Sequence, residues 1–189
     1  MYGGWSLTSS NGDYRDGWVF GDSYVNNTAD TPEALIEQNR SNNLKGAMAY
    51  SKPTQLCIGE IAKLISWLES EGFYPRRARV MLLKAKGKSN YHRDYPGWLY
   101  GVRLHIPIKT NSGALFICDE GAAHLPADGS AYLLRVNRMH QVVNSGDTDR
   151  LHFICDFFDT KKKTSHHQFT DEDKKCFQKV RDQLEQSRY

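Results

Sequence analysis

The hydrophobic positions divide the chain into a helical first part, a strand-rich middle and a helical end. Within residues 54–70 the apolar side chains recur at helical spacing, at Leu56, Ile61, Leu64, Ile65 and Leu68. Gly72 follows this stripe and is typical of a helix end. A shorter helix should begin at Thr31-Pro32, with Thr as the N-cap and Pro in the first turn.

From Arg79 onward the pattern changes to short apolar runs separated by Gly, Asn, Asp and Ser. We expect strands at 79–86, 91–94, 102–110, 114–118, 131–136, 140–144 and 151–158. Many short strands at this spacing predict a sandwich or barrel. Helices that precede and follow such a block should pack on its outside. The expected fold class is therefore mainly β, with flanking α-helices.

The two ends of the chain have patterns of their own. Asn11-Gly12 is a hairpin-turn dipeptide, so residues 1–30 should form a hairpin that either covers the sheet or acts as a lid over a substrate. Phe177, Val180 and Leu184 give residues 170–188 one apolar edge, which predicts a C-terminal helix. We expect a single domain over 1–189, with helical support at 31–75 and the β core at 76–158.

Composition narrows the class of protein without naming a function. The chain has 189 residues, of which 25% are charged, and its net charge of +3 is too small to indicate nucleic-acid binding. No apolar run approaches the length of about 18 residues that a membrane span needs. The N-terminus lacks a signal-peptide pattern and no two cysteines form a CxxC pair, so we expect a cytoplasmic protein with reduced thiols. The oligomeric state stays open.

Three short pieces of the sequence carry the chemistry. His92 and Asp94 are two residues apart and would point the same way on a strand, and His140 begins a later strand. Two imidazoles and one carboxylate form a facial triad that suits ferrous iron and leaves coordination positions open. The pair His92-x-Asp94 alone is a weak signal, and its weight comes from where His140 falls. The alternative is a surface HxD beside an unrelated core histidine.

Two cationic positions accompany the triad. Arg150 opens the strand after His140, and its guanidinium could hold the carboxylate of an anionic co-substrate with two hydrogen bonds. Arg103 and His105 form a second pair at period two, so both would face the interior together. They would then bind an anion, or else form a structural Arg–Asp pair beside a satisfied core histidine.

The segment 92–156, and more loosely 76–158, resembles the aspartyl/asparaginyl β-hydroxylase family of Fe(II)- and 2-oxoglutarate-dependent oxygenases, the small bacterial L-proline cis-hydroxylases among them. The matching stretches are Ala78-Arg79-Val80 with Leu82-Leu83, His92-Arg93-Asp94-Tyr95, Val102-Arg103-Leu104-His105-Ile106, Met139-His140 with Asn144, and Arg150-Leu151-His152-Phe153 followed by Asp156. Residues 1–30 have no counterpart in this resemblance.

The resemblance implies a double-stranded β-helix, also called a cupin or jelly-roll core. It implies His92, Asp94 and His140 as the Fe(II) ligands and Arg150 as the anchor for 2-oxoglutarate, with Arg103 and His105 near the oxo-acid end. Retention of Asp94 favours hydroxylation over halogenation.

The implied activity is hydroxylation of an unactivated carbon with O2, giving succinate and CO2. A free amino acid or small derivative is the first expected substrate and a peptidyl Asp, Asn or Pro the second. A metal-binding cupin-like protein without catalysis is the other alternative. We expect no nucleic-acid or membrane partner.

Overall fold

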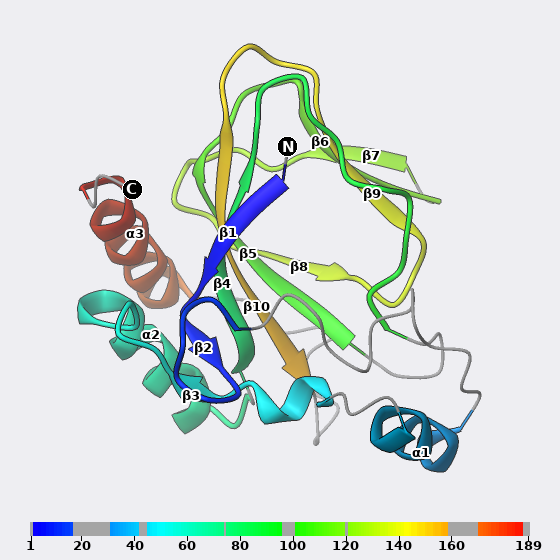
Figure 1. Cartoon of the computed structure of the whole chain (residues 1–189). Coiled ribbons are helices and arrows are strands. Elements are labelled where there is room, and N and C mark those ends of the chain that lie inside the picture. The colour runs from blue at the N-terminus through cyan, green and yellow to red at the C-terminus, as the bar shows by residue number, and fades with distance from the viewer. Residues whose placement is uncertain are drawn as a thin grey trace.

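The computed structural model describes residues 2–16, 31–41, 45–73, 75–95, 101–119, 121–158 and 170–186. Two antiparallel sheets form its centre (Figure 1). The larger has the order β1-β4-β10-β5-β8, with bounds Tyr2–Ser6, Pro75–Leu83, Arg150–Phe158, Gly101–Lys109 and Tyr132–Arg135. The smaller has the order β7-β6-β9, with bounds Gly121–His124, Ala114–Cys118 and His140–Asn144. The short strands β2 (Thr8–Ser9) and β3 (Lys52–Pro53) pair separately.

The helices are α1 (Pro32–Ser41), the 3₁₀ turn η2 (Ala47–Ala49), α2 (Gly59–Ser70) and α3 (Asp171–Gln186). Thr31 caps α1 as predicted, because its hydroxyl accepts a hydrogen bond from the Ala34 amide at 3.2 Å. Gly72 ends α2 with a φ of +80°, a conformation that glycine adopts without a steric penalty. None of the helices in the described ranges is long and apolar enough to cross a membrane.

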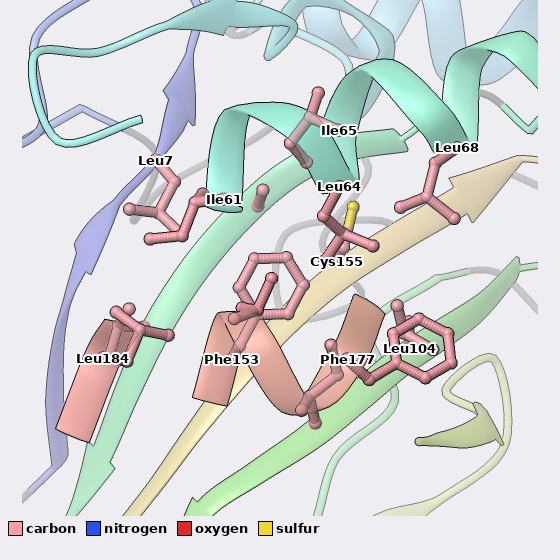
Figure 2. Packing of buried hydrophobic residues seen from close by; sticks show 14 of the residues in the cluster. Leu7, Ile61, Leu64, Ile65, Leu68, Leu104, Phe153, Cys155, Phe177 and Leu184 are labelled. Carbon is pink, nitrogen blue, oxygen red and sulfur yellow. The ribbon is translucent and has the colours of Figure 1, made fainter. Parts of the chain in front are cut away.

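A hydrophobic core joins α2 and α3 to the outer face of the larger sheet (Figure 2). Leu64 of α2, Phe177 of α3 and Phe153 of β10 are each fully buried within it. Burying a side chain of this size contributes about 1.5–3 kcal/mol relative to leaving it exposed. The apolar stripe at 54–70 and the apolar edge at 177–184 therefore both pack on the same face of the larger sheet.

In strands β5 and β10, apolar side chains point to one face of the sheet and most of the polar side chains point to the other. Val102, Leu104, Ile106 and Ile108 of β5 belong to the helix-facing core, as do Leu151, Phe153 and Cys155 of β10. Because strand side chains alternate, Arg103, His105, Arg150, His152 and Asp156 lie on the opposite face, toward the smaller sheet. All five are nevertheless buried. Charged residues inside the sandwich, with apolar residues under the helices, mark the inter-sheet space as the functional side.

The mainly β, double-stranded β-helix class with flanking helices is confirmed. Three local expectations were wrong in detail. The helix predicted from residue 54 begins at Gly59, because residues 54–57 form a turn in which the Cys57 amide bonds to the Thr54 carbonyl. Residues 91–94 are not a regular strand, and only His92 bridges to His140. No strand was expected between residues 118 and 131, but β7 lies there and pairs with β6 as a hairpin.

Residues 2–16 add to the larger sheet on the side away from β8. β1 pairs with β4, from Tyr2 opposite Leu83 to Ser6 opposite Arg79. The chain then turns back, and the Asp16 carboxylate accepts hydrogen bonds from the amide and hydroxyl of Ser10 at 2.9 and 2.6 Å. The rest of the predicted hairpin or lid, residues 17–30, lies outside the described residues.

Candidate metal centre and active site

His92, Asp94 and His140 come together at one end of the inter-sheet space. One potential ligand atom from each lies within 4.8 Å of the others. The Nε2 atom of His140 is 3.5 Å from Oδ2 of Asp94, and Nε2 of His92 is 4.0 Å from Oδ1. Three ligands about 2.1 Å from a shared ion require spacings of this order or slightly less. The arrangement is therefore that of a metal-binding triad.

Backbone hydrogen bonds orient both imidazoles. Nδ1 of His92 lies 2.6 Å from the Asn90 carbonyl, and Nδ1 of His140 lies 2.8 Å from the Arg138 carbonyl. A carbonyl only accepts hydrogen bonds, so each Nδ1 carries the proton and each Nε2 presents its lone pair. This is how proteins fix the tautomer of a metal-binding histidine. The donor set, two neutral nitrogens and one carboxylate oxygen, suits a divalent transition metal.

Asp94 stays ionised although it is buried. Burial by itself would raise the pKa of its carboxyl group, but the charge of Arg103 and the neighbouring His140 and His92 hold that pKa well below the usual range. Nη1 of Arg103 donates to Oδ2 of Asp94 at 2.7 Å. An ionised carboxylate is the form that binds a metal.

The cationic residues predicted from the sequence line the same cavity as two of the triad side chains. Its walls are formed by Met81, Ser89, His92, Arg103, His105, Phe116, Val136, His140, Val142, Arg150 and Ile154. The enclosed volume is about 20 Å³, so a ligand larger than a water molecule would require side-chain movement. The structure thus brings all six predicted site residues together, with Asp94 beside the cavity.

Several polar atoms in this region have no hydrogen-bond partner among the described residues, namely Arg103 Nη2, His105 Nε2 and His152 Nε2. A buried polar atom without a partner costs about 1–3 kcal/mol. Nη2 of Arg150 lies 2.9 Å from Nδ1 of His152, which must therefore be the acceptor. The cluster has spare hydrogen-bonding capacity for a polar ligand.

His105 and His152 are neutral. Burial, followed by the charge of Arg150, holds the pKa of each well below its ordinary value. Their Nδ1 atoms are 3.4 Å apart. His152 Nδ1 uses its lone pair to accept from Arg150, so the proton of this neutral ring is on Nε2, which is a donor.

Sequence reasoning missed two parts of the site. Phe116 of β6 stacks on the His140 ring at 5.1 Å between centroids, with the planes 21° apart. The carboxylate of Asp156 accepts a hydrogen bond from Nε of Arg103. Asp156 continues the alternation of Arg150, His152 and Ile154 along the strand, and this pattern indicates that it faces inward. His124 lies on β7, and its Nδ1 is 3.0 Å from the Ala114 carbonyl.

A second hollow of about 370 Å³ lies beside the metal centre, between β7 and β8. It shares Phe116 with the buried cavity. Its walls are Phe116, Cys118, Gly121, Ala122, Ala123, Leu133, Leu134, Arg135 and Arg138. Both β7 and β8 are edge strands within the described part of the chain, so the groove follows the open side of the sandwich. Its size is within the range of small-ligand sites.

The chain is similar to several solved structures at low identity. A cupin domain from Bordetella pertussis Tohama I is 19% identical, with 44% of this chain and 80% of that chain covered and a TM-score of 0.35. A predicted oxalate decarboxylase from Thermotoga maritima is 14% identical, with 50% and 73% covered and a TM-score of 0.36. The Cupin_2 domain of an XRE family transcriptional regulator from Enterobacter cloacae is 14% identical, with 48% and 87% covered and a TM-score of 0.37.

The search of the curated proteins finds no significant match to this chain. The family model described as aspartyl/asparaginyl beta-hydroxylase matches residues 45–160, which is more than half of the chain. That span includes the triad, Arg103, His105 and Arg150, and it contains every strand that lines the metal cavity. The chain therefore belongs to the aspartyl/asparaginyl β-hydroxylase family.

Proposed function

We propose that this protein is a non-haem Fe(II)- and 2-oxoglutarate-dependent dioxygenase that hydroxylates an unactivated carbon of an amino acid or small amino-acid derivative. The observation that carries the proposal is the cavity that His92 and His140 share with Arg150. A purely structural metal site has no need of a buried guanidinium beside it. Family membership supports hydroxylation as the class of reaction.

In this proposal the triad holds the metal and the cationic cluster holds the co-substrate. Iron, 2-oxoglutarate and O2 supply the oxidising chemistry, with succinate and CO2 as co-products. His92 and His140 would bind the ion through Nε2, and Asp94 through its carboxylate. Arg150 would hold the distal carboxylate of 2-oxoglutarate, with its orientation set by His152.

The unpaired atoms of the cluster fit an anionic ligand. The Nη2 of Arg103 can only donate, and it is buried next to the metal centre. A carboxylate oxygen in the cavity would satisfy it. Because the pKa values of His105 and His152 are held low, the positive charge facing that anion comes from the two arginines. The cavity must widen from its present 20 Å³ for 2-oxoglutarate to enter.

The groove between β7 and β8 is the candidate substrate site. Phe116 lines both this groove and the metal cavity, so a molecule bound in the groove would lie near the metal centre. A free amino acid is the first expected substrate. The groove's volume of about 370 Å³ and its position between two edge strands also favour a second candidate, a peptidyl Asp, Asn or Pro residue.

The test is succinate release from 2-oxoglutarate with ferrous iron, screened over free amino acids and short peptides. The Asp94→Ala variant is the background control. Substrate-dependent succinate from the wild type supports the proposal, and the class of molecule that elicits it decides between the two substrates. No turnover on the whole panel, combined with no measurable 2-oxoglutarate binding, would leave the alternative of a non-catalytic metal-binding cupin-like protein.

A further inference from the structure

We propose that Asp156 is a positioning residue for the metal centre, and that it acts on the ligand Asp94 through Arg103. The inference rests on the proposed metal site, and it concerns a carboxylate that does not itself reach that site. Asp156 lies near the end of β10 and is fully buried. Its nearest charged neighbours are Arg103 and Arg77.

Arg103 connects the two carboxylates. Its Nε donates to Oδ1 of Asp156, while its Nη1 donates to Oδ2 of Asp94 at 2.7 Å. A guanidinium is planar and rigid, so fixing two of its nitrogens fixes the orientation of the whole group. The contact with Asp156 therefore decides where Nη1 meets Asp94.

Asp156 is itself held in place from the other side. Its Oδ2 accepts hydrogen bonds from Nη1 of Arg77 at 2.9 Å and from the hydroxyl of Tyr95 at 2.7 Å. Arg77 and Tyr95 are as completely buried as Asp156. Burial, with the nearby charge of Asp156, raises the pKa of Tyr95 well above its usual value, so its hydroxyl remains a donor.

The backbone is irregular on both strands beside these contacts. The register between β10 and β4 shifts between Ile154 and Asp156, which is the signature of a β-bulge. Opposite the shift, Arg77 adopts a φ of +52°, in the left-handed region that a non-glycine residue rarely occupies. Such a conformation costs on the order of 1 kcal/mol and persists where the surroundings enforce it.

The charges give Asp156 a second effect. Burial alone would raise its pKa, but Arg103 and Arg77, with Arg79, hold that pKa below the usual value, so the group is an anion. Its charge offsets the charge of Arg103, which would otherwise oppose the entry of a divalent cation beside Asp94. Asp156 thus keeps Arg103 both oriented and electrically compensated.

The consequence falls on the geometry of Asp94. Oδ2 accepts the hydrogen bond from Arg103 and lies 3.5 Å from Nε2 of His140, while Oδ1 lies 4.0 Å from Nε2 of His92. Arg103 therefore holds the Asp94 carboxylate in the rotation that presents it to both imidazoles. Loss of Asp156 would release the guanidinium, loosen the Asp94 carboxylate and leave a buried positive charge near the ion.

Metal titration tests the inference without relying on turnover. Co²⁺ is the probe, because its visible absorption reports both binding and ligand geometry. We expect Asp156→Asn to weaken Co²⁺ binding by about 10-fold or more, as loss of outer-shell partners does, and to change the Co²⁺ spectrum. Asp149→Asn, which removes one carboxylate charge from the Lys84 ion pair elsewhere, is the matched control and should bind as the wild type does.

A double-mutant cycle tests the route through Arg103. Arg103→Lys keeps the charge but cannot bind both carboxylates in the same way, so it should also weaken Co²⁺ binding. If Asp156 acts through Arg103, adding Asp156→Asn to Arg103→Lys produces no further loss beyond about 2-fold. Independent, additive losses would overturn the proposal, as would a folded Asp156→Asn protein with wild-type affinity.

Three further outcomes can be told apart. If Asp156→Asn does not fold, Asp156→Glu keeps the charge and displaces the carboxylate by one methylene, and wild-type Co²⁺ affinity in that variant overturns the inference. If the wild type itself binds no Co²⁺, the proposed metal site has failed, and the role of Asp156 fails with it. Binding by the wild type with no loss in the variants rejects the positioning role alone.

Discussion

His92 and His140 exchange two backbone hydrogen bonds, from the His92 amide to the His140 carbonyl at 2.9 Å and from the His140 amide to the His92 carbonyl at 2.7 Å. Residues paired in this way project their side chains on the same face. Their imidazole rings accordingly lie 4.6 Å apart between centroids. The two nitrogens of the triad are thus set side by side by main-chain pairing, which a substitution of either side chain leaves in place.

The first prediction concerns that pair. His140→Ala should weaken Co²⁺ or Fe²⁺ binding by more than roughly 100-fold, the upper end of what losing an outer-shell partner costs, because one of three ligands is removed. His124→Ala, which removes an imidazole outside the triad, is the control. Isothermal titration under anaerobic conditions measures both. An unchanged affinity would remove His140 from the triad.

A substitution of Arg150 should weaken the binding of 2-oxoglutarate and leave metal binding unchanged. Replacing it with Met removes the guanidinium but keeps an apolar stem, so 2-oxoglutarate affinity should fall by about 10-fold or more, the loss expected for one charge-assisted contact. Co²⁺ affinity should stay near that of the wild type. Arg181→Met, which breaks a surface pair with Glu185 on α3, is a control of matched chemistry. Equal 2-oxoglutarate affinity in Arg150→Met and wild type would rule out the anchor role.

The neutral histidines predict a pH dependence of stability. The folded-state pKa of His152 lies well below 6.5, so below about pH 6.5 the unfolded chain binds a proton that the folded chain does not. This difference in proton binding does not change the free energy of unfolding above that pH. As the pH falls below it, the free energy of unfolding decreases by up to about 1.4 kcal/mol per pH unit.

His152→Asn tests this dependence, because Asn can still accept the hydrogen bond from Arg150 but does not titrate. Urea unfolding of the metal-free protein from pH 7.5 to 5 provides the measurement. The free energy of unfolding of the wild type should fall more steeply with decreasing pH than that of the variant. Parallel curves would show that His152 is protonated alike in both states.

If the groove between β7 and β8 is the substrate site, filling it should prevent turnover. Ala123 lies directly opposite Phe116 in the β6–β7 ladder and lines the groove. Ala123→Trp should fill this space and abolish substrate-dependent succinate release, while Co²⁺ and 2-oxoglutarate affinities are retained. Ala49→Trp, at an exposed position in η2, controls for the added indole. Undiminished turnover by Ala123→Trp would place the substrate elsewhere.

Much of the architecture could be predicted because it depends on local pattern. The periodic apolar stripes gave the helices that pack on the sheet, and turn residues separated the strands. The errors arose where tertiary contacts override local preference. Residues 91–94 read as a strand but form a single bridge, and residues 121–124, where no strand was expected, form the second strand of a hairpin. Hairpin pairing depends on a partner strand that local composition does not specify.

The sequence by itself determined the candidate ligands, the cationic partners and the family, because residue identity decides which atoms can bind a metal or a carboxylate. Only the tertiary structure decided how these residues are held. The hydrogen bond between Arg103 and Asp156 and the stacking of Phe116 on His140 join residues far apart in the chain. Such contacts follow from strand register and a β-bulge, which arise when the sheets pack and have no signature in a single segment.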